Sequence, residues 1–195
     1  MKFKLHTFKT APEKSISLLK DSQQSFGMVP NLHAVMAESP ATLNAYKILH
    51  ELFQESDFNT EELTVIWQTI NIEHACNYCV PAHTGIAHMM HVNQSIIDAL
   101  LSKKEMPNDK LQVLHLTTLA LVRNRGHLSD DEKQRFLQAG YQNQHLLEIV
   151  LGIAQKVMSN YINHLADTPV DPMFEKYIWD QSQVESHEQA ISTST

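Results

Sequence analysis

Apolar residues recur every three or four positions along most of this chain, which is the spacing of one face of an α-helix. The pattern is clear over residues 13–25, 110–122 and 142–164. No segment alternates as a half-buried strand does, and only 5 glycines and 7 prolines are present, so few turns need special backbone angles. The pattern predicts an all-α fold, with about seven or eight helices packed as one bundle.

Several short motifs predict where these helices begin and end. Ser39-Pro40 resembles an N-cap followed by proline at the first helical position, and Thr60 is a candidate cap for the next helix. Ser129–Glu132 forms a capping box. The segment Ala166–Pro169 is expected to end the last long helix, because proline disfavours helix in the residue before it.

Charge and composition narrow the class of protein. The net charge is -7 and no Lys/Arg cluster is interleaved with aromatic residues, which argues against nucleic-acid binding. No apolar run approaches the roughly 20 residues of a membrane span, and the first ten residues are too polar for a signal peptide. We therefore expect a cytoplasmic protein with a single domain over residues 1–180 and a polar, flexible tail over residues 181–195.

The two cysteines of the chain, Cys76 and Cys79, are three positions apart. A disulfide across so short a loop would constrain the unfolded chain little, so the pair indicates redox or metal chemistry rather than a disulfide that stabilises the fold. Pro81 is tolerated only in the first turn of a helix, so a helix should begin between residues 77 and 80. That position places the cysteines at a helix N-terminus, where the dipole favours a thiolate.

His83 and Glu73 are the candidate partners of the cysteines. His83 follows Cys79 by four residues, so the two side chains share one helix face, and the imidazole can take the thiol proton. Glu73 precedes Cys76 by three residues and could orient His83 if the preceding helix reaches this far. The predicted catalytic set is Cys76, Cys79, His83 and Glu73, with no cofactor and no metal, and the spacing leaves open which cysteine attacks first.

The segment around these residues resembles the alkylhydroperoxidase D-like branch of the carboxymuconolactone decarboxylase family. The resemblance rests on the Cys-x-x-Cys-x-x-x-His motif with an upstream glutamate, and on the surrounding pattern Cys-x-Tyr-Cys-Val-x-Ala-His. Two downstream segments, Leu121–Gly126 and Asn160–Pro169, are also similar, so the resemblance spans about residues 35–175.

This resemblance implies an all-α fold that assembles into dimers, trimers or hexamers. It also implies reduction of hydroperoxides, with a separate thiol or protein as reductant, and a proton relay from a glutamate through histidine to a cysteine. In the best-known members the relay glutamate lies about three helical turns before the first cysteine. Thr64 occupies that offset here, so the relay role falls to Glu73, as in other members of the branch.

Four alternatives stay open at this point. The cysteines could be buried and inert, or they could bind zinc together with His83 and His88, although no second cysteine pair is present. The protein could instead be a non-redox decarboxylase or lactone-processing enzyme. Finally, the protein could be a redox-sensing binding module, in which a disulfide between Cys76 and Cys79 changes the contact with a partner.

Overall fold

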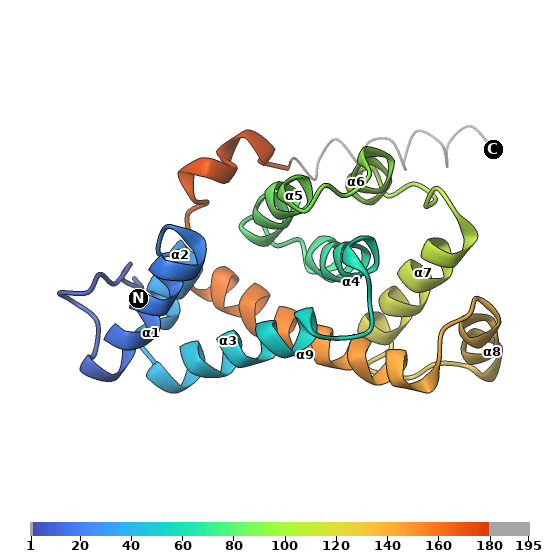
Figure 1. Ribbon diagram of the computed structural model, residues 1–195, viewed down its shortest axis with the longest axis horizontal. Helices are drawn as coiled ribbons and strands as arrows, with labels where there is room; N and C mark the ends of the chain where they lie inside the picture. The colour runs from blue at the N-terminus through green and yellow to red at the C-terminus, as the bar shows by residue number, and fades with distance from the viewer. Residues whose placement is uncertain (1, 180–195) are drawn as a thin grey trace.

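A computed structural model of the chain describes residues 2–179, and all regular secondary structure in this range is helical. The all-α prediction is confirmed, and the helices of eight or more residues agree in number with the prediction. The short helices α2 and η1 were not predicted, and the predicted tail over residues 181–195 lies outside the described range. The elements in chain order are α1 (Glu13–Phe26), α2 (Asn31–Met36), α3 (Pro40–Gln54), α4 (Thr60–Glu73), α5 (Cys79–Met89), α6 (Gln94–Leu101), α7 (Asp109–Arg123), α8 (Asp130–Gln138), α9 (Asn143–Ala166) and η1 (Pro172–Tyr177) (Figure 1).

Most of the predicted helix ends are confirmed. The Ser39 side chain caps α3, and the capping box of Ser129 and Glu132 opens α8. The cap of α4 is one residue earlier than predicted. Asn59, not Thr60, accepts from the backbone N–H of Glu62, and the Glu62 carboxylate accepts from the Asn59 N–H, each at 3.0 Å. The reciprocal pair satisfies two N–H groups that would otherwise lack partners.

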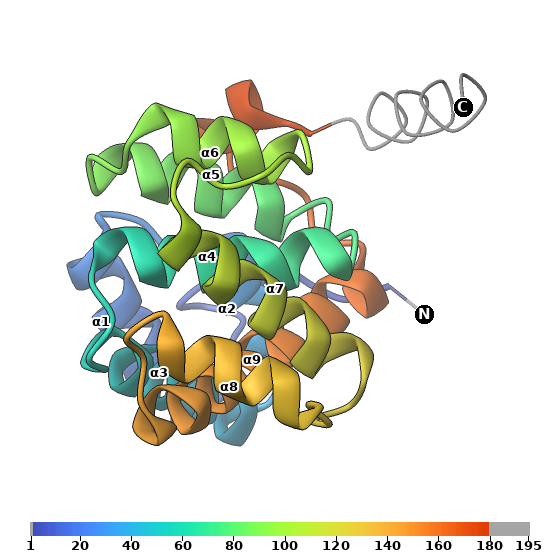
Figure 2. The ribbon, with the colours of Figure 1, turned by 90° about the vertical axis from the view of Figure 1, so that its right-hand side faces the viewer.

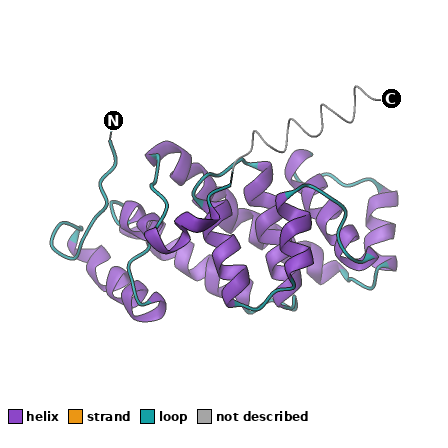
Figure 3. Ribbon diagram, turned by 90° about the horizontal axis from the view of Figure 1, so that it is seen from above, coloured by secondary structure: helices purple, strands orange, loops and turns teal. Residues whose placement is uncertain are grey.

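Helix α4 lies in the middle of the fold and contacts α5, α6, α7 and α9. Figure 2 shows α5 and α6 on one side of α4, with α3 and α9 on the other. Figure 3 shows the molecule from above, with helices joined by loops. The central position explains why Trp67, Ile66 and Ile70 of α4 are almost completely buried. None of the helices within residues 2–179 is long and apolar enough to cross a membrane.

Two hydrophobic clusters support the fold. The larger one surrounds α4, α6 and α7, while the smaller one joins α1, α2 and α3 to the segment that carries Cys76 and Cys79. Helix η1 packs against α5, and the Phe174 ring lies directly over Gly85. A Cβ atom at position 85 would overlap that ring, so glycine is needed here for the close approach.

Candidate functional site

The cysteines lie at the break between α4 and α5. Ala75 adopts a left-handed backbone conformation with φ of 50°, which turns the chain after α4. Cys79 is the first residue of α5, so the predicted helix start near residues 77–80 is confirmed. Cys76 and Cys79 form a disulfide with a Cα–Cα distance of 5.2 Å, and the Cys79 N–H donates to Cys76 Sγ at 3.2 Å. The predicted pairing of the two sulfurs therefore needs no rearrangement of the backbone.

A cavity of about 420 Å³ reaches Cys79 and His83. Cys79 is in its wall, whereas Cys76 is fully buried and does not line it. Among the described residues that line the cavity there is no Asp, Glu, Lys or Arg. Most of the wall is aromatic or apolar, and it includes Phe26, Leu32, Tyr46, Trp67, Tyr78, Ile86, Met89, Met90, Met173 and Phe174.

The two other histidines of the wall are held by hydrogen bonds inside the protein. His33 Nδ1 is 2.8 Å from Ser22 Oγ, and His50 Nδ1 is 3.1 Å from Gln155 Nε2. Burial is the main cause that lowers the pKa of His33 to about 3 and the pKa of His50 to about 4. Both rings are therefore neutral at pH 7, and the cavity as a whole is suited to an uncharged molecule.

His83 is buried between α4 and α9. Its ring lies against Trp67 with the ring centres 5.0 Å apart, and its Nε2 is 2.8 Å from Nζ of Lys156. Burial lowers the pKa of His83 well below its usual range, and Lys156 and then His50 lower it further. The imidazole is consequently neutral at pH 7 and can accept a proton from a nearby thiol.

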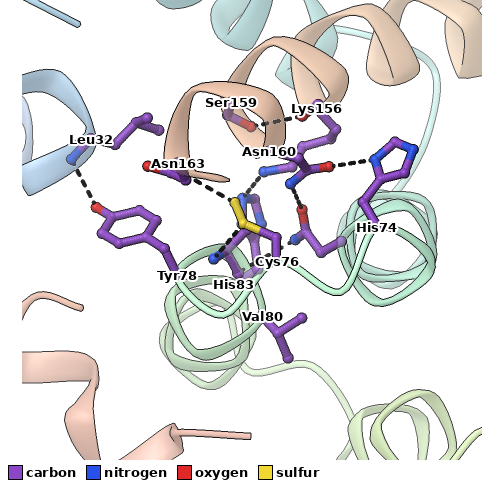
Figure 4. Close-up of a disulfide and its surroundings, with 12 residues drawn as sticks. Leu32, His74, Cys76, Tyr78, Val80, His83, Lys156, Ser159, Asn160 and Asn163 are labelled. Atoms are coloured by element: carbon purple, nitrogen blue, oxygen red, sulfur yellow. Dashed lines mark hydrogen bonds between the residues drawn. A yellow bond between two sulfur atoms is a disulfide. The ribbon is translucent and has the colours of Figure 1, made fainter. Parts of the chain in front are cut away.

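Lys156 on α9 was missed by the sequence reasoning. Its side chain is 1% exposed, and burial lowers its pKa to about 7. Its neighbours on the inner face of α9 also contact the cysteine region. Asn163 donates to Cys79 Sγ at 3.2 Å, and Asn160 links His74 to Asn71. Figure 4 shows these side chains reaching from α9 toward the disulfide and His83.

The predicted place of Glu73 beside His83 needs correction. Both carboxylate oxygens of Glu73 accept from Arg123 of α7, at 2.7 and 2.8 Å. Glu73 is the last residue of α4 and lies on the side that faces α7, while His83 faces α9. Thr64, at the offset of the family's relay glutamate, donates to the backbone oxygen of Thr60. The structure thus brings Cys76, Cys79 and His83 together, but it holds Glu73 on Arg123.

Tyr78, between the two cysteines, ties the C-terminal segment to the site. Its hydroxyl donates to Asp171 at 2.6 Å and accepts from the backbone N–H of Leu32 at 3.2 Å. Asp171 accepts in addition from the N–H of Asn31 at 2.9 Å. Burial raises the pKa of Asp171 above its ordinary value. These bonds join the start of α2 to Asp171, the residue that precedes η1.

The residues considered as zinc ligands do not form a metal site in the structure. His88 stacks on Tyr177 with the ring centres 5.1 Å apart, and the cysteine sulfurs are bonded to each other. Within residues 2–179, no group of three or more His, Cys, Asp or Glu side chains is placed to hold a metal ion.

The comparisons with known proteins show the fold. No protein-family model and no curated protein matches the sequence. Among solved structures, the chain is similar to an alkylhydroperoxidase AhpD core, an uncharacterized peroxidase-related protein from Ralstonia eutropha JMP134. The TM-score is 0.78 at 16% identity, covering 89% of this chain and 93% of that one. A peroxidase-related protein from Silicibacter sp. TM1040 gives 0.75 at 16% identity, covering 89% and 92%.

The debrominase Bmp8 has the same fold. Its apo structure gives a TM-score of 0.71 at 19% identity, covering 85% of this chain and 90% of that one. A variant of Bmp8 in complex with 2,3,4-tribromopyrrole gives 0.71 at 18% identity, covering 85% and 89%. The expected alkylhydroperoxidase D-like fold is therefore confirmed, and the likeness at these identities concerns the fold alone.

Proposed function

We propose that the protein is a thiol-dependent hydroperoxide reductase of the cytoplasm that serves antioxidant defence through Cys76 and Cys79. One observation carries this proposal. The two cysteines of the chain form a disulfide, and its Cys79 lines an apolar cavity that the buried, neutral His83 lines as well. Such a pair can cycle between dithiol and disulfide, and the cavity can admit an uncharged organic hydroperoxide next to the sulfur.

Cys79 is proposed as the attacking residue because it lines the cavity and Cys76 does not. The start of α5 and the N–H of Asn163 both favour a thiolate at Cys79. The thiolate attacks one peroxide oxygen, so that an S–O bond forms while the O–O bond breaks. The leaving alkoxide takes the proton that His83 received from the thiol, which gives the alcohol.

Cys76 completes the cycle. Its thiol attacks the sulfenic acid on Cys79, a disulfide forms and water leaves. An external thiol or a protein reductant, which the structure does not identify, then restores both thiols. Glu73 is not assigned a step, because its carboxylate is engaged by Arg123.

Single cysteine variants test the assignment. Reduced Cys76→Ser and Cys79→Ser are each mixed with cumene hydroperoxide, and sulfenic acid is trapped with dimedone and located by mass spectrometry. We expect the adduct on Cys79 in the first variant and no adduct in the second. An adduct only in Cys79→Ser would assign the attack to Cys76, and full peroxide turnover by both variants would exclude the mechanism.

Reductive dehalogenation is a second candidate, favoured by the uncharged, aromatic wall of the cavity next to Cys79. In that reaction the thiolate takes a halogen from an aromatic ring and the ring carbon takes a proton. Cys76 then displaces halide to give the disulfide. Bromide release from 2,3,4-tribromopyrrole by the reduced protein, without oxidation by cumene hydroperoxide, would replace the first proposal by this one.

Two other functions would give different experimental results. Peroxide reduction no faster than that of a free thiol would favour a redox-sensing module. Activity on a carboxylactone that survives loss of both cysteines would favour a non-redox enzyme.

We also propose that a second copy of the chain covers the outer face of α9, so that the protein is a homo-oligomer. Leu147 and Leu165 are each 73% exposed and Tyr161 is 55% exposed. Together with three further residues they form a row whose spacing alternates between four and three positions, as in paired helices. Such a face can pair with its own copy about a twofold axis. The row consists of Leu147, Leu151, Ala154, Met158, Tyr161 and Leu165.

A further inference from the structure

A buried lysine, Lys156, lies next to His83 and has no part in the step described above. Lys156 Nζ is 2.8 Å from His83 Nε2, and its side chain is almost completely enclosed. Within residues 2–179, none of the ion pairs includes Lys156, so no carboxylate there would balance its charge when the amine is protonated. Burying an unpaired ammonium group is costly, which means that stability alone does not explain this residue.

We propose that Lys156 is a positioning residue that stores the thiol proton through His83, in the role that a carboxylate would otherwise fill. This inference deepens the proposed function and rests on it. It is supported by the placement of three residues: Glu73 is held by Arg123, Thr64 bonds to its own helix, and His83 bonds only to Lys156 among the described polar side chains.

The proton can travel in both directions through the imidazole. In the resting dithiol state the amine is neutral, and His83 Nε2 donates to it. The Cys79 thiol gives its proton to Nδ1 while the Nε2 hydrogen moves to Lys156, which leaves a thiolate and an ammonium ion. After the O–O bond breaks, the same proton returns through His83 to the alkoxide. The electrons come from the thiolate alone, and Lys156 is neutral again at the end.

The groups around Lys156 are compatible with this role. Of the titratable residues, His83 on α5 and His50 on α3 interact with its charge. His50 is neutral because burial, Lys156 and Lys47 all lower its pKa. Burial sets the pKa of Lys156 to about 7, so the amine can both accept and release a proton near neutral pH.

The test titrates the Cys79 thiol by its ultraviolet thiolate absorbance in a Cys76→Ser background, with Lys156, Lys156→Met or Lys156→Arg. Methionine keeps the length and apolar stem of the side chain, and arginine keeps a positive charge that does not titrate near neutral pH. Circular dichroism and thermal melts confirm that each variant is folded. Peroxide turnover is measured separately, with Cys76 restored.

We expect Lys156→Met to raise the midpoint of the thiol titration by about one unit or more, which is a roughly tenfold loss of thiolate near neutral pH. We expect Lys156→Arg to retain the low midpoint but to lose peroxide turnover, because it cannot return the proton. An unchanged midpoint in Lys156→Met, or wild-type turnover in Lys156→Arg, would overturn the inference. The titration uses no peroxide, so an inactive wild-type protein would reject the proposed function and leave the role of Lys156 to be decided by the midpoints.

Discussion

Replacing Lys156 by methionine should remove a pH-dependent part of the free energy of unfolding. Lys156 keeps its proton up to about pH 10.5 in the unfolded chain, but burial lowers its pKa in the folded protein to about 7. Between these two values the unfolded state binds more protons than the folded state. The free energy of unfolding must therefore rise with pH across this window.

The expected size follows from the shift. One pKa unit corresponds to about 1.36 kcal/mol, so the fall from 10.5 to about 7 amounts to roughly 5 kcal/mol at most. Between about pH 7 and pH 9 the wild-type protein should gain roughly 2–3 kcal/mol relative to Lys156→Met. Below pH 7 the lysine is charged in both states, so the full cost of burial is present and the methionine variant should be the more stable protein.

Urea unfolding of the oxidised protein at several pH values measures this difference. The control is Lys133→Met, which removes a half-exposed lysine that pairs with Asp130 on the surface. This control should follow the wild-type curve, because the lysine it removes is open to solvent. Parallel curves for the wild type and Lys156→Met would contradict the lowered pKa of Lys156, since they would show that it has the same proton affinity in both states.

Three further predictions follow from the packing of α5 and η1 and from the outer face of α9. Tyr78→Phe removes the hydroxyl that donates to Asp171, so urea unfolding should show a loss of about 1.5–3 kcal/mol, and an unchanged value would contradict that contact. Gly85→Ala places a methyl group against the Phe174 ring, which should displace η1 and lower the Tm by several degrees in a thermal melt; an unchanged Tm would show that η1 yields freely. Leu165→Glu places a charge in the exposed apolar row of α9, so analytical ultracentrifugation should show a smaller species than the wild type, and an identical sedimentation pattern would place the interface elsewhere.

The arrangement of Cys76, Cys79 and His83 could be predicted because these residues are close together in the sequence. Pro81 restricts the start of α5, and the spacings of Cys76, Cys79 and His83 then follow from helix geometry. The positions of Cys79 at the helix start and of Cys76 beside it needed no information from the rest of the chain. The all-α class was predictable for the same reason, because it depends on the spacing of apolar residues within single helices.

Helix α9 shows why the other half of the site was missed. Its apolar residues repeat at helical spacing, which normally marks the buried face. In the structure, four of the six residues of the row on the outer face are exposed, and Leu151 and Met158 are partly buried. Lys156, Asn160 and Asn163 are buried on the opposite side. The signal that could have revealed the site was a polar stripe at helical spacing within an otherwise amphipathic helix. That stripe contacts α5 from more than 70 residues away, and pairings at this range are set by tertiary packing.

The position of Glu73 was misjudged for a related reason. Three residues of sequence separate it from Cys76, but the left-handed turn at Ala75 lies between them. Glu73 remains on the α7 side of α4, where Arg123 binds both of its oxygens. Glu73 is close to the cysteines in sequence but does not face His83, because the helix ends before the turn at Ala75 and the chain changes direction there.

A count of free thiols in the reduced protein, before and after one equivalent of cumene hydroperoxide, shows whether Cys76 and Cys79 reduce a peroxide. Because Cys76 and Cys79 are the only cysteines of the chain, an Ellman-type reagent reports on this pair alone. We expect both thiols to disappear within seconds and to return on addition of a dithiol. Two thiols that still titrate after minutes with peroxide would contradict it.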